Sequence, residues 1–228
     1  MLKFYYNTGP NPMKIALFLE EAGLDYEPIP LDTRKGDQHL AEYLIINPNA
    51  KAPTIVDGDV TVFDSNAILL YLAEKTGKFL PAASDKSRGE LLSWLMFVAT
   101  GVGPYSGQSV HFRVHAPEQI PYALNRYAFE ARRHFGILND RLTDRAHILG
   151  DEYTIIDMAV WGWARLISRV LSEEAKSEFP HLQRLIDQIT ARPAGQRVIA
   201  FSKEHAFKTE MDAESHRNMF PGNPPKID

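Results

Sequence analysis

The chain has 228 residues, of which 44% are hydrophobic and 24% charged, as is typical of a folded protein with a sizeable core. The formal net charge of −4 argues against a nucleic-acid surface, and no apolar run approaches the roughly 20 residues that a membrane helix needs. The chain has no cysteine, so it can hold no disulfide, no Cys-zinc site and no cysteine nucleophile. Any thiol chemistry must use a thiol from a cofactor or substrate. The N-terminus enters a strand pattern without a signal peptide, and we expect a cytoplasmic protein.

Residues 1–81 alternate between strand and helix patterns. Apolar residues at helical spacing predict a first helix that Gly23 ends, and the turn Asp57-Gly58-Asp59 between two short apolar runs predicts a hairpin. The predicted elements are strand Leu2–Tyr6, helix Asn11–Ala22, strand Tyr26–Leu31, helix His39–Ile46, strands Thr54–Val56 and Val60–Phe63, and helix Ser65–Lys75. This βαβαββα order is typical of a thioredoxin-like domain.

Beyond a linker at Pro81–Asp85 the patterns become helical. The predicted helices are Lys86–Gln108, Pro117–Leu142, Thr154–Leu171, Pro180–Ala191 and Pro193–Phe201. Near the end of the first of them, Gly101, Gly103 and Gly107 together with Pro104 predict a bend or a break. Thr154 with Asp157 predicts a capping box. We therefore expect a thioredoxin-like domain at 1–81, an all-α domain at 87–205 and a polar tail at 206–228, in which Pro221–Pro225 is extended or mobile.

Two short motifs in the first domain predict a binding site. Pro53 stands at a strand start, where the peptide bond before a proline can be cis. A cis bond here would point the backbone N–H and C=O of Ala52 toward open solvent. These two groups could pair with an extended peptide, as a sheet edge does. Asp64 and Ser65 open the next helix and offer a hydroxyl and backbone N–H groups to a carboxylate. Together the motifs predict a pocket for a small acidic peptide, although Asp64-Ser65 could serve as a helix cap alone.

The Ala-Pro strand start, the Asp-Ser helix start and the Asp-Gly hairpin together resemble the glutathione-binding half of the soluble glutathione S-transferases. The capping box at Thr154 resembles the helix start of their all-helical domain, and the resemblance covers nearly all of residues 1–205. It implies a thioredoxin-like domain followed by a helical bundle, a homodimer, and reduced or oxidised glutathione as co-substrate.

In this family, the group that activates the glutathione sulfur lies between the first strand and the first helix. The segment Thr8–Lys14 is most similar to the Nu class of Ure2-like bacterial transferases, in which a Thr-Pro-Asn-Gly loop is typical. Here Gly9 holds the threonine position and Pro12 holds that of the glycine. The resemblance therefore implies Asn11 as the first candidate for contact with the sulfur and Thr8 as the second.

Both candidates can donate a hydrogen bond and neither can take the thiol proton, so we expect electrostatic stabilisation of the thiolate rather than general-base catalysis. Two alternatives stay open at this stage. Asn11 could merely cap the helix, with Pro12 at its first position, or a hydroxyl of Tyr5 or Tyr6 could activate the sulfur.

The resemblance also implies the remaining glutathione contacts. At the two ends of the peptide they are Lys51 near the glycine carboxylate, Gln38 near the glycine end, Ser65 at the γ-glutamyl carboxylate and Asp64 at the γ-glutamyl ammonium. Ala52 beside Pro53 is expected at the cysteinyl backbone, and Arg126 is expected to reach the neighbouring subunit's site. Gln38 and Arg126 could instead lie on solvated helix faces. An acceptor cleft is expected at Tyr105, Gln108 and Phe112. His111 and His115 lack further ligands, so we predict no metal site.

The chain is therefore predicted to be a glutathione-dependent enzyme that reduces small disulfides or peroxides and conjugates electrophiles modestly. Because it has no cysteine, disulfide exchange must run between glutathione thiols and the substrate. Two alternatives remain: a non-enzymatic binding or regulatory protein with this fold, which the altered Thr8–Pro12 loop allows, and a conventional transferase or dehalogenase. The expected partners are glutathione and a small electrophile, disulfide or peroxide, with no nucleic acid and no membrane.

Overall fold

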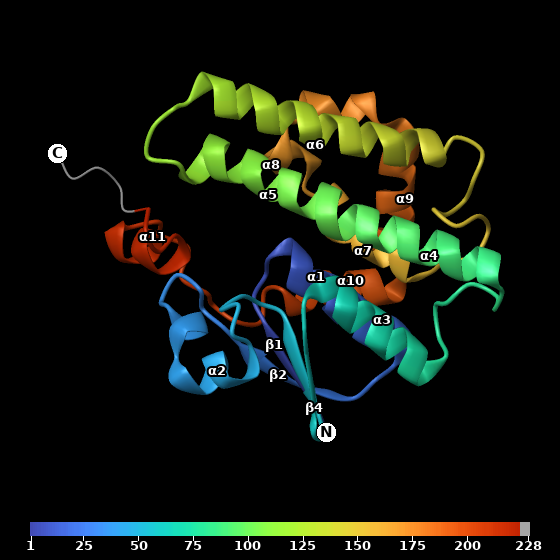
Figure 1. Cartoon of the computed structure of the whole chain (residues 1–228), viewed down its shortest axis with the longest axis horizontal. Helices are drawn as coiled ribbons and strands as arrows, with labels where there is room; N and C mark the ends of the chain where they lie inside the picture. Colours follow the sequence, from blue (N-terminus) through green and yellow to red (C-terminus); the bar gives the residue numbers. More distant parts are fainter. Residues whose placement is uncertain (224–228) are drawn as a thin grey trace. The chain divides into compact units, whose positions relative to one another are not determined.

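The computed structural model describes residues 1–223, which form two compact units. The first unit comprises Met1–Tyr71 together with the chain from Pro193 onward, and the second is Leu72–Arg192. The blue and red ends of the chain in Figure 1 therefore belong to the same unit. Among the described residues, no helix has both the length and the apolar character that crossing a membrane requires.

The first unit is built on a mixed sheet. Within residues 1–223 the sheet has four strands in the order β2-β1-β3-β4. The strands are β1 (Leu2–Tyr6), β2 (Tyr26–Pro30), β3 (Thr54–Asp57) and β4 (Val60–Phe63). β1 pairs parallel with β2 and antiparallel with β3, and β3 forms the predicted hairpin with β4 across Gly58, whose φ of 66° suits a glycine. The thioredoxin-like order is confirmed.

Within its described residues, the first unit contains the four predicted helices, with bounds within about two residues of those predicted, and two further short helices, η1 (Asp37–His39) and α11 (Ala213–Met219). The predicted helices are α1 (Pro10–Ala22), α2 (Ala41–Ile46), α3 (Ser65–Thr76) and α10 (Pro193–Phe201), and α3 continues into the second unit. The helix predicted at His39–Ile46 is interrupted because Leu40 is extended, with φ −62° and ψ 138°. α1 packs against α10, and the ring of Tyr6 lies 4.6 Å from that of Phe201.

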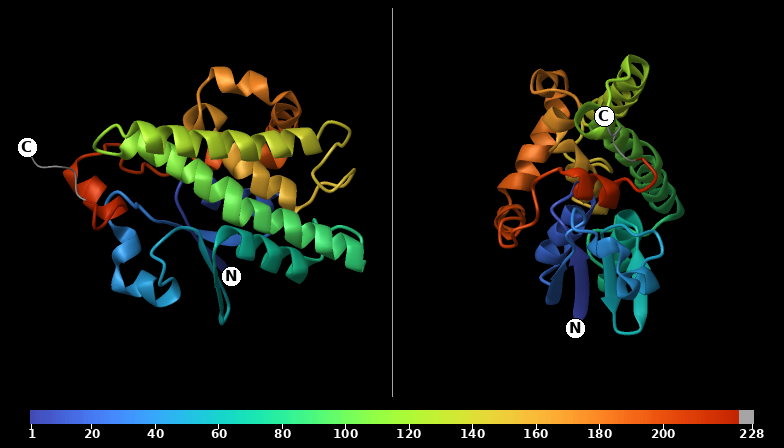
Figure 2. Two further views of the ribbon diagram at one scale, coloured as in Figure 1. Left: turned by 45° about the horizontal axis from the view of Figure 1, so that its top comes forward. Right: turned by 90° about the vertical axis from the view of Figure 1, so that its left-hand side faces the viewer.

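Helix α11 lies in the segment that the sequence predicted only as a polar tail. Asp212 caps it by accepting a hydrogen bond from the N–H of Ser215 at 2.8 Å. Two further bonds tie the tail to the loop after β2: Arg34 Nη1 donates to Lys208 O at 3.0 Å, and Asn218 Nδ2 donates to Arg34 O at 2.9 Å. Figure 2 shows α11 in red beside this blue loop. The extended segment predicted at Pro221–Pro225 lies partly outside the described residues.

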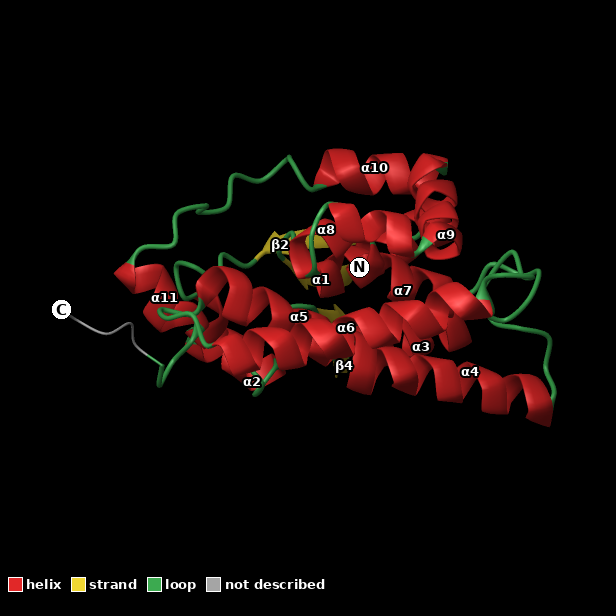
Figure 3. Ribbon diagram, turned by 90° about the horizontal axis from the view of Figure 1, so that it is seen from above, coloured by secondary structure: helices red, strands yellow, loops and turns green. Residues whose placement is uncertain are grey.

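The second unit is helical, as predicted. Its elements are α4 (Asp85–Phe97), η2 (Val98–Val102), α5 (Gly103–Val110), η3 (His111–His115), α6 (Pro121–Arg141), α7 (Ile155–Ala164), α8 (Ile167–Val170), η4 (Glu174–Glu178) and α9 (Pro180–Ala191). α5 and α6 lie side by side (Figure 3). The capping box is confirmed, since Thr154 N donates to Asp157 Oδ2 at 2.8 Å. The single helix predicted at Thr154–Leu171 is two helices, α7 and α8.

The glycine-rich part of the helix predicted at Lys86–Gln108 has a packing role. The chain widens into a π-helical turn at η2 and continues as α5. A Cβ on Gly101 would lie 2.3 Å from Nε2 of His134. The His134 ring cannot easily retreat, because it sits 5.1 Å from the rings of both Phe97 and Tyr105 and its Nδ1 is 2.7 Å from Glu130 O. Position 101 is therefore a glycine because α6 approaches so closely.

Gly101→Ala is expected to lower the free energy of unfolding by about 2 kcal/mol, since the added methyl group would overpack the contact with His134. Gly89→Ala on α4 is the matched control. A Cβ at Gly89 would meet nothing within 4 Å, so this change should raise the free energy of unfolding by about 0.5–1 kcal/mol through helix propensity. Urea unfolding of both variants checks the pair, and equal effects would contradict the packing role.

Candidate functional site

The sheet register brings three predicted site segments together at one edge of the first unit, the edge where β1 and β4 end and β3 begins. Tyr5 of β1 pairs with Thr54 of β3, and Thr54 pairs with Phe63 of β4. The loop that follows β1, the loop that precedes β3 and the loop that follows β4 therefore meet at the same edge. These loops carry the predicted contacts Thr8, Asn11, Lys51, Ala52, Pro53, Asp64 and Ser65.

The loop after β1 ends in a helix start that differs from the expectation. Gly9 is the N-cap and Pro10 the first helical residue, so the alternative in which Asn11 caps the helix with Pro12 in first position is wrong. Asn7 Oδ1 accepts the Gly9 N–H at 2.9 Å, and a Cβ at position 9 would lie 2.8 Å from the same oxygen. Asn7 thus explains why a glycine stands where the Nu-class loop has threonine.

Asn11 is half-buried at the second position of α1, whereas Thr8 is exposed just outside the helix. Pro10 and Pro12 have no N–H, and the Met13 N–H donates to Gly9 O at 3.2 Å. Among the first three residues of α1, Asn11 is therefore the one with a backbone N–H, and its side-chain amide is a second hydrogen-bond donor.

The tyrosine alternative has less support. Tyr6 is buried, with its ring among those of Phe4 and Phe201. Burial, assisted by Glu204, raises the pKa of the Tyr6 hydroxyl, so this group is harder to ionise than an ordinary tyrosine. Tyr5 is half-buried, and its ring lies 5.6 Å from that of Tyr43. These surroundings are those of a packed core rather than of a sulfur-activating group.

The bond between Ala52 and Pro53 is cis, as the sequence allowed. Within residues 1–223, no hydrogen bond joins the backbone N–H or C=O of Ala52 to another residue. The preceding loop is fixed by a buried network that sequence reasoning missed. Lys51 O accepts bonds from Tyr43 OH at 2.7 Å and Asn47 Nδ2 at 2.6 Å, and Asn47 Nδ2 also donates to Thr54 Oγ1 at 2.9 Å. The available signal in the sequence was the asparagine directly before Pro48, a position typical of turns.

Asn47→Ala should lower the free energy of unfolding by about 2 kcal/mol, because it removes two buried hydrogen bonds, to Lys51 O and Thr54 Oγ1. It should also weaken binding of the glutathione that the sequence leads us to expect at this loop. Asn49→Ala in the same loop is the control, since Asn49 is exposed and uses its backbone N–H to reach Asn47. Urea unfolding and calorimetric titration measure the two effects. Equal stability of the two variants would show that the network does not support the loop.

At the start of α3, Asp64 caps the helix and Ser65 makes a hydrogen bond with a buried lysine. Asp64, whose φ is 71°, accepts bonds at Oδ1 from Asn66 N at 2.8 Å and Ala67 N at 3.2 Å. Its Oδ2 has no partner among the described residues. Ser65 is buried, and its Oγ accepts a bond from Lys14 Nζ at 3.2 Å. Burial lowers the pKa of Lys14 to about 7, although the Asp64 carboxylate opposes that shift.

Three of the predicted contacts have other partners or surroundings. The alternative of a solvated helix face is wrong for Gln38, which is buried and donates from Nε2 to Thr33 O at 3.2 Å and Asn218 O at 2.8 Å. The Lys51 side chain is exposed. Arg126 is exposed on α6 in the second unit and forms a 2.8 Å ion pair with Glu130.

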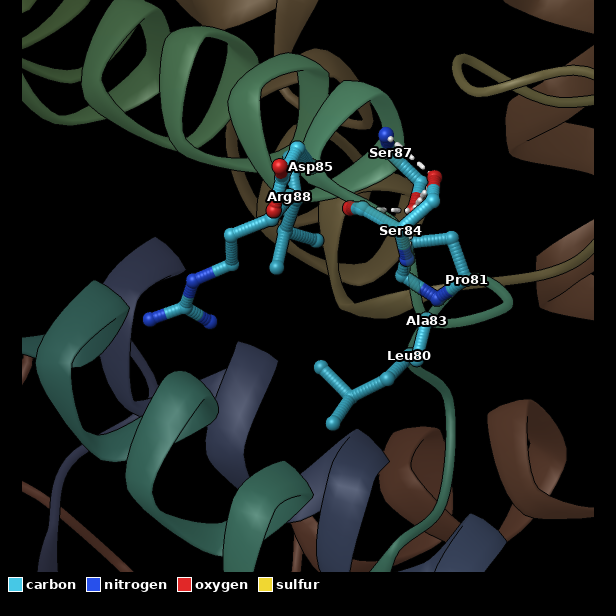
Figure 4. Close-up of a pocket in the computed structure, with 8 residues that line it drawn as sticks. Leu80, Pro81, Ala83, Ser84, Asp85, Ser87 and Arg88 are labelled. Carbon is cyan, nitrogen blue, oxygen red and sulfur yellow. Dashed lines mark hydrogen bonds between the residues drawn. The ribbon is translucent and has the colours of Figure 1, made fainter.

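The residues expected in the acceptor cleft lie in the second unit. Tyr105 packs on His134, Phe112 stacks on Tyr127 at 5.2 Å, and Gln108 is exposed. The same unit has a cavity of about 490 Å³ between the linker and the start of α4, drawn in Figure 4 with Ser84 hydrogen-bonded to Ser87. None of the predicted site residues lines this cavity.

Two protein-family models match the chain. The model described as "Glutathione S-transferase, N-terminal domain" covers residues 1–74, and the one described as "Glutathione S-transferase, C-terminal domain" covers residues 119–193. The chain is 42% identical over 207 residues to the disulfide-bond oxidoreductase YfcG of Escherichia coli, a match that spans 87% of this chain and 95% of the relative.

Two solved structures are similar along most of the chain. One is a glutathione transferase from Burkholderia graminis with two glutathione molecules bound per subunit, at a TM-score of 0.82, 34% identity, and coverage of 90% of this chain and 89% of that one. The other is the glutathione transferase URE2P6 from Phanerochaete chrysosporium in complex with oxidised glutathione, at a TM-score of 0.82, 34% identity, and coverage of 88% and 96%.

Proposed function

The chain belongs to the glutathione S-transferase family, and we propose that it is an enzyme that uses bound glutathione to reduce small disulfides. The observation that carries the proposal is the edge of the first unit, where the α1 start, the cis Ala52–Pro53 bond and the α3 start meet. The disulfide-bond oxidoreductase named among the relatives and the bound glutathione in both solved structures support it.

Each segment has a role that its chemistry allows. Asn11 donates to the glutathione sulfur and favours the thiolate, with Thr8 as the second donor. The backbone of Ala52 pairs with the cysteinyl residue, since both its N–H and its C=O lack partners within residues 1–223. Ser65 binds the γ-glutamyl carboxylate, and Asp64 Oδ2 takes the ammonium group.

The reaction is a pair of thiol–disulfide exchanges. The bound thiolate attacks one sulfur of the substrate disulfide, a mixed disulfide with glutathione forms, and the other sulfur leaves as a thiolate that takes a proton. A second glutathione thiolate then attacks the mixed disulfide and yields glutathione disulfide and the second substrate thiol. Two glutathione molecules are oxidised for each disulfide reduced. No protein thiol takes part, because the chain has no cysteine.

Further parts of the proposal follow from the family. We place the chain closest to the Nu class, as a homodimer in the cytoplasm, where the thiol pool is reducing. Peroxides and electrophiles are further substrates. Lys51 and Gln38 serve the glycine end, and Arg126 reaches the site of the other subunit. The domains are taken as 1–81 and 87–205, with 206–228 as the tail.

Calorimetric titration with reduced and then oxidised glutathione tests the proposal, followed by turnover with 2-hydroxyethyl disulfide as a small probe. Micromolar binding of oxidised or paired reduced glutathione with turnover is the expected result. Binding without turnover of a disulfide, peroxide or electrophile would leave a non-enzymatic binding protein. Turnover of electrophiles alone would make the chain a conjugating transferase. Binding of neither form would overturn the proposal.

A further inference from the structure

Lys14 is an unusual residue in the core of the first unit. It lies on α1 between buried residues and is itself only 1% exposed. Within residues 1–223 its ammonium group makes one hydrogen bond, the 3.2 Å contact with Ser65 Oγ. Lysine side chains are seldom fully buried, and a buried charge is usually paired. The placement of a lysine here needs an explanation that packing does not supply.

The hydrogen bond from Lys14 determines which further hydrogen bond the Ser65 hydroxyl can make. When its Oγ accepts from Lys14, the Ser65 hydroxyl proton remains for another acceptor. No other residue in the described part of the chain supplies that acceptor. Ser65 stands at the first position of α3, where backbone N–H groups and the helix dipole favour an anion. A carboxylate in front of Ser65 would therefore complete a chain from Lys14 through the hydroxyl to the ligand.

We propose that Lys14 is a positioning residue for the γ-glutamyl carboxylate of glutathione: it holds the Ser65 hydroxyl as a donor and supplies a buried positive charge behind it. This role rests on the function proposed above. It deepens that function, because it explains recognition of the γ-glutamyl end by a residue behind the contact surface.

The same arrangement couples ligand binding to protonation. Burial leaves the Lys14 pKa near 7, and among the described residues the charged group that faces it is Asp64 on the α3 side, which raises that pKa. A ligand carboxylate close by would raise the Lys14 pKa further. The complex should therefore take up close to one proton above neutral pH, and the affinity should fall as the pH rises from 6.5 to 8.5.

Calorimetry with S-methylglutathione tests the role, since this ligand has the γ-glutamyl carboxylate and no ionisable thiol. Titrations at pH 6.5, 7.5 and 8.5, each in two buffers of different ionisation enthalpy, give the affinity and the proton uptake. For the wild-type protein we expect about a tenfold loss of affinity across this range. In Lys14→Met the affinity should be about tenfold or more weaker at pH 6.5 and nearly independent of pH. Lys3→Met, at an exposed lysine of β1, is the control and should behave as the wild type.

A second ligand separates positioning from a general structural effect. S-methylcysteinylglycine lacks the γ-glutamyl group, so Lys14→Met should bind it as the wild type does. Equal losses for both ligands, or no loss for either, would overturn the role. Proton uptake near zero in the wild type would overturn it without any variant, even if Lys14→Met fails to fold. Failure of the wild type to bind glutathione would instead overturn the proposed function, and this role with it.

Discussion

Asn11→Ala is expected to lower kcat/KM for glutathione-dependent disulfide reduction by about 10- to 100-fold, with little change in the free energy of unfolding. A hydrogen bond to a charged group contributes about 1.5–3 kcal/mol, which corresponds to that range of rates. Asn11 is half-buried, does not cap α1 and is flanked by two prolines that lack an N–H. Its amide is therefore the side chain of the first helical turn best able to stabilise a thiolate.

The pH–rate profile distinguishes this role from a loss of binding. A free thiol has a pKa of about 8.5, so a variant without the donor should reach full activity only at a higher pH than the wild type. Thr8→Ala should reduce the rate less, because Thr8 is exposed outside the helix. An unchanged rate in Asn11→Ala together with a large loss in Thr8→Ala would reverse the assignment. Unchanged rates in both would direct attention to Tyr5.

The elements of the first unit could be predicted because local patterns determine them. The alternation in Leu2–Tyr6 and the Asp57-Gly58-Asp59 turn depend on neighbours a few residues apart, and the structure has both β1 and the hairpin. The edge at which the site segments meet follows instead from the thioredoxin-like order of the elements, which implies the pairing of β1 with β3. Once β1, β3 and β4 are antiparallel neighbours, the three loops must lie together.

The remaining features depend on contacts between residues far apart in the sequence. Lys14 and Ser65 are 51 residues apart, and Gln38 is held by Asn218, 180 residues away. No local pattern shows either pair. The need for a glycine at position 101 of η2 comes from His134 of α6. Helix α11 has seven residues, too few for a clear periodic pattern, and it is stabilised by the loop after β2. One local signal for Lys14 existed: a lysine inside an otherwise apolar helix.

Lys14→Met is expected to change how stability depends on pH. In the wild-type protein the Lys14 pKa is about 7 in the folded state and near ~10.4 in the unfolded state. Between these values the unfolded chain binds one more proton than the folded chain, so the stability of the wild type rises with pH through this residue. Below about pH 7 both states are protonated, and the full cost of burying the charge is present.

The variant cannot gain this stability. Its free energy of unfolding relative to the wild type should therefore fall by about 4 kcal/mol between pH 6 and pH 10.5. All other titrating groups are shared, so they cancel from the difference. Urea unfolding at pH 6, 8 and 10.5, at one fixed protein concentration, measures it. Lys3→Met on β1 should show a difference that does not vary with pH. If the difference in free energy of unfolding between Lys14→Met and the wild type did not vary with pH, burial would not lower the Lys14 pKa. The expected slope would show that the fold keeps a destabilising buried charge beside Ser65, at a place where a ligand carboxylate can interact with it.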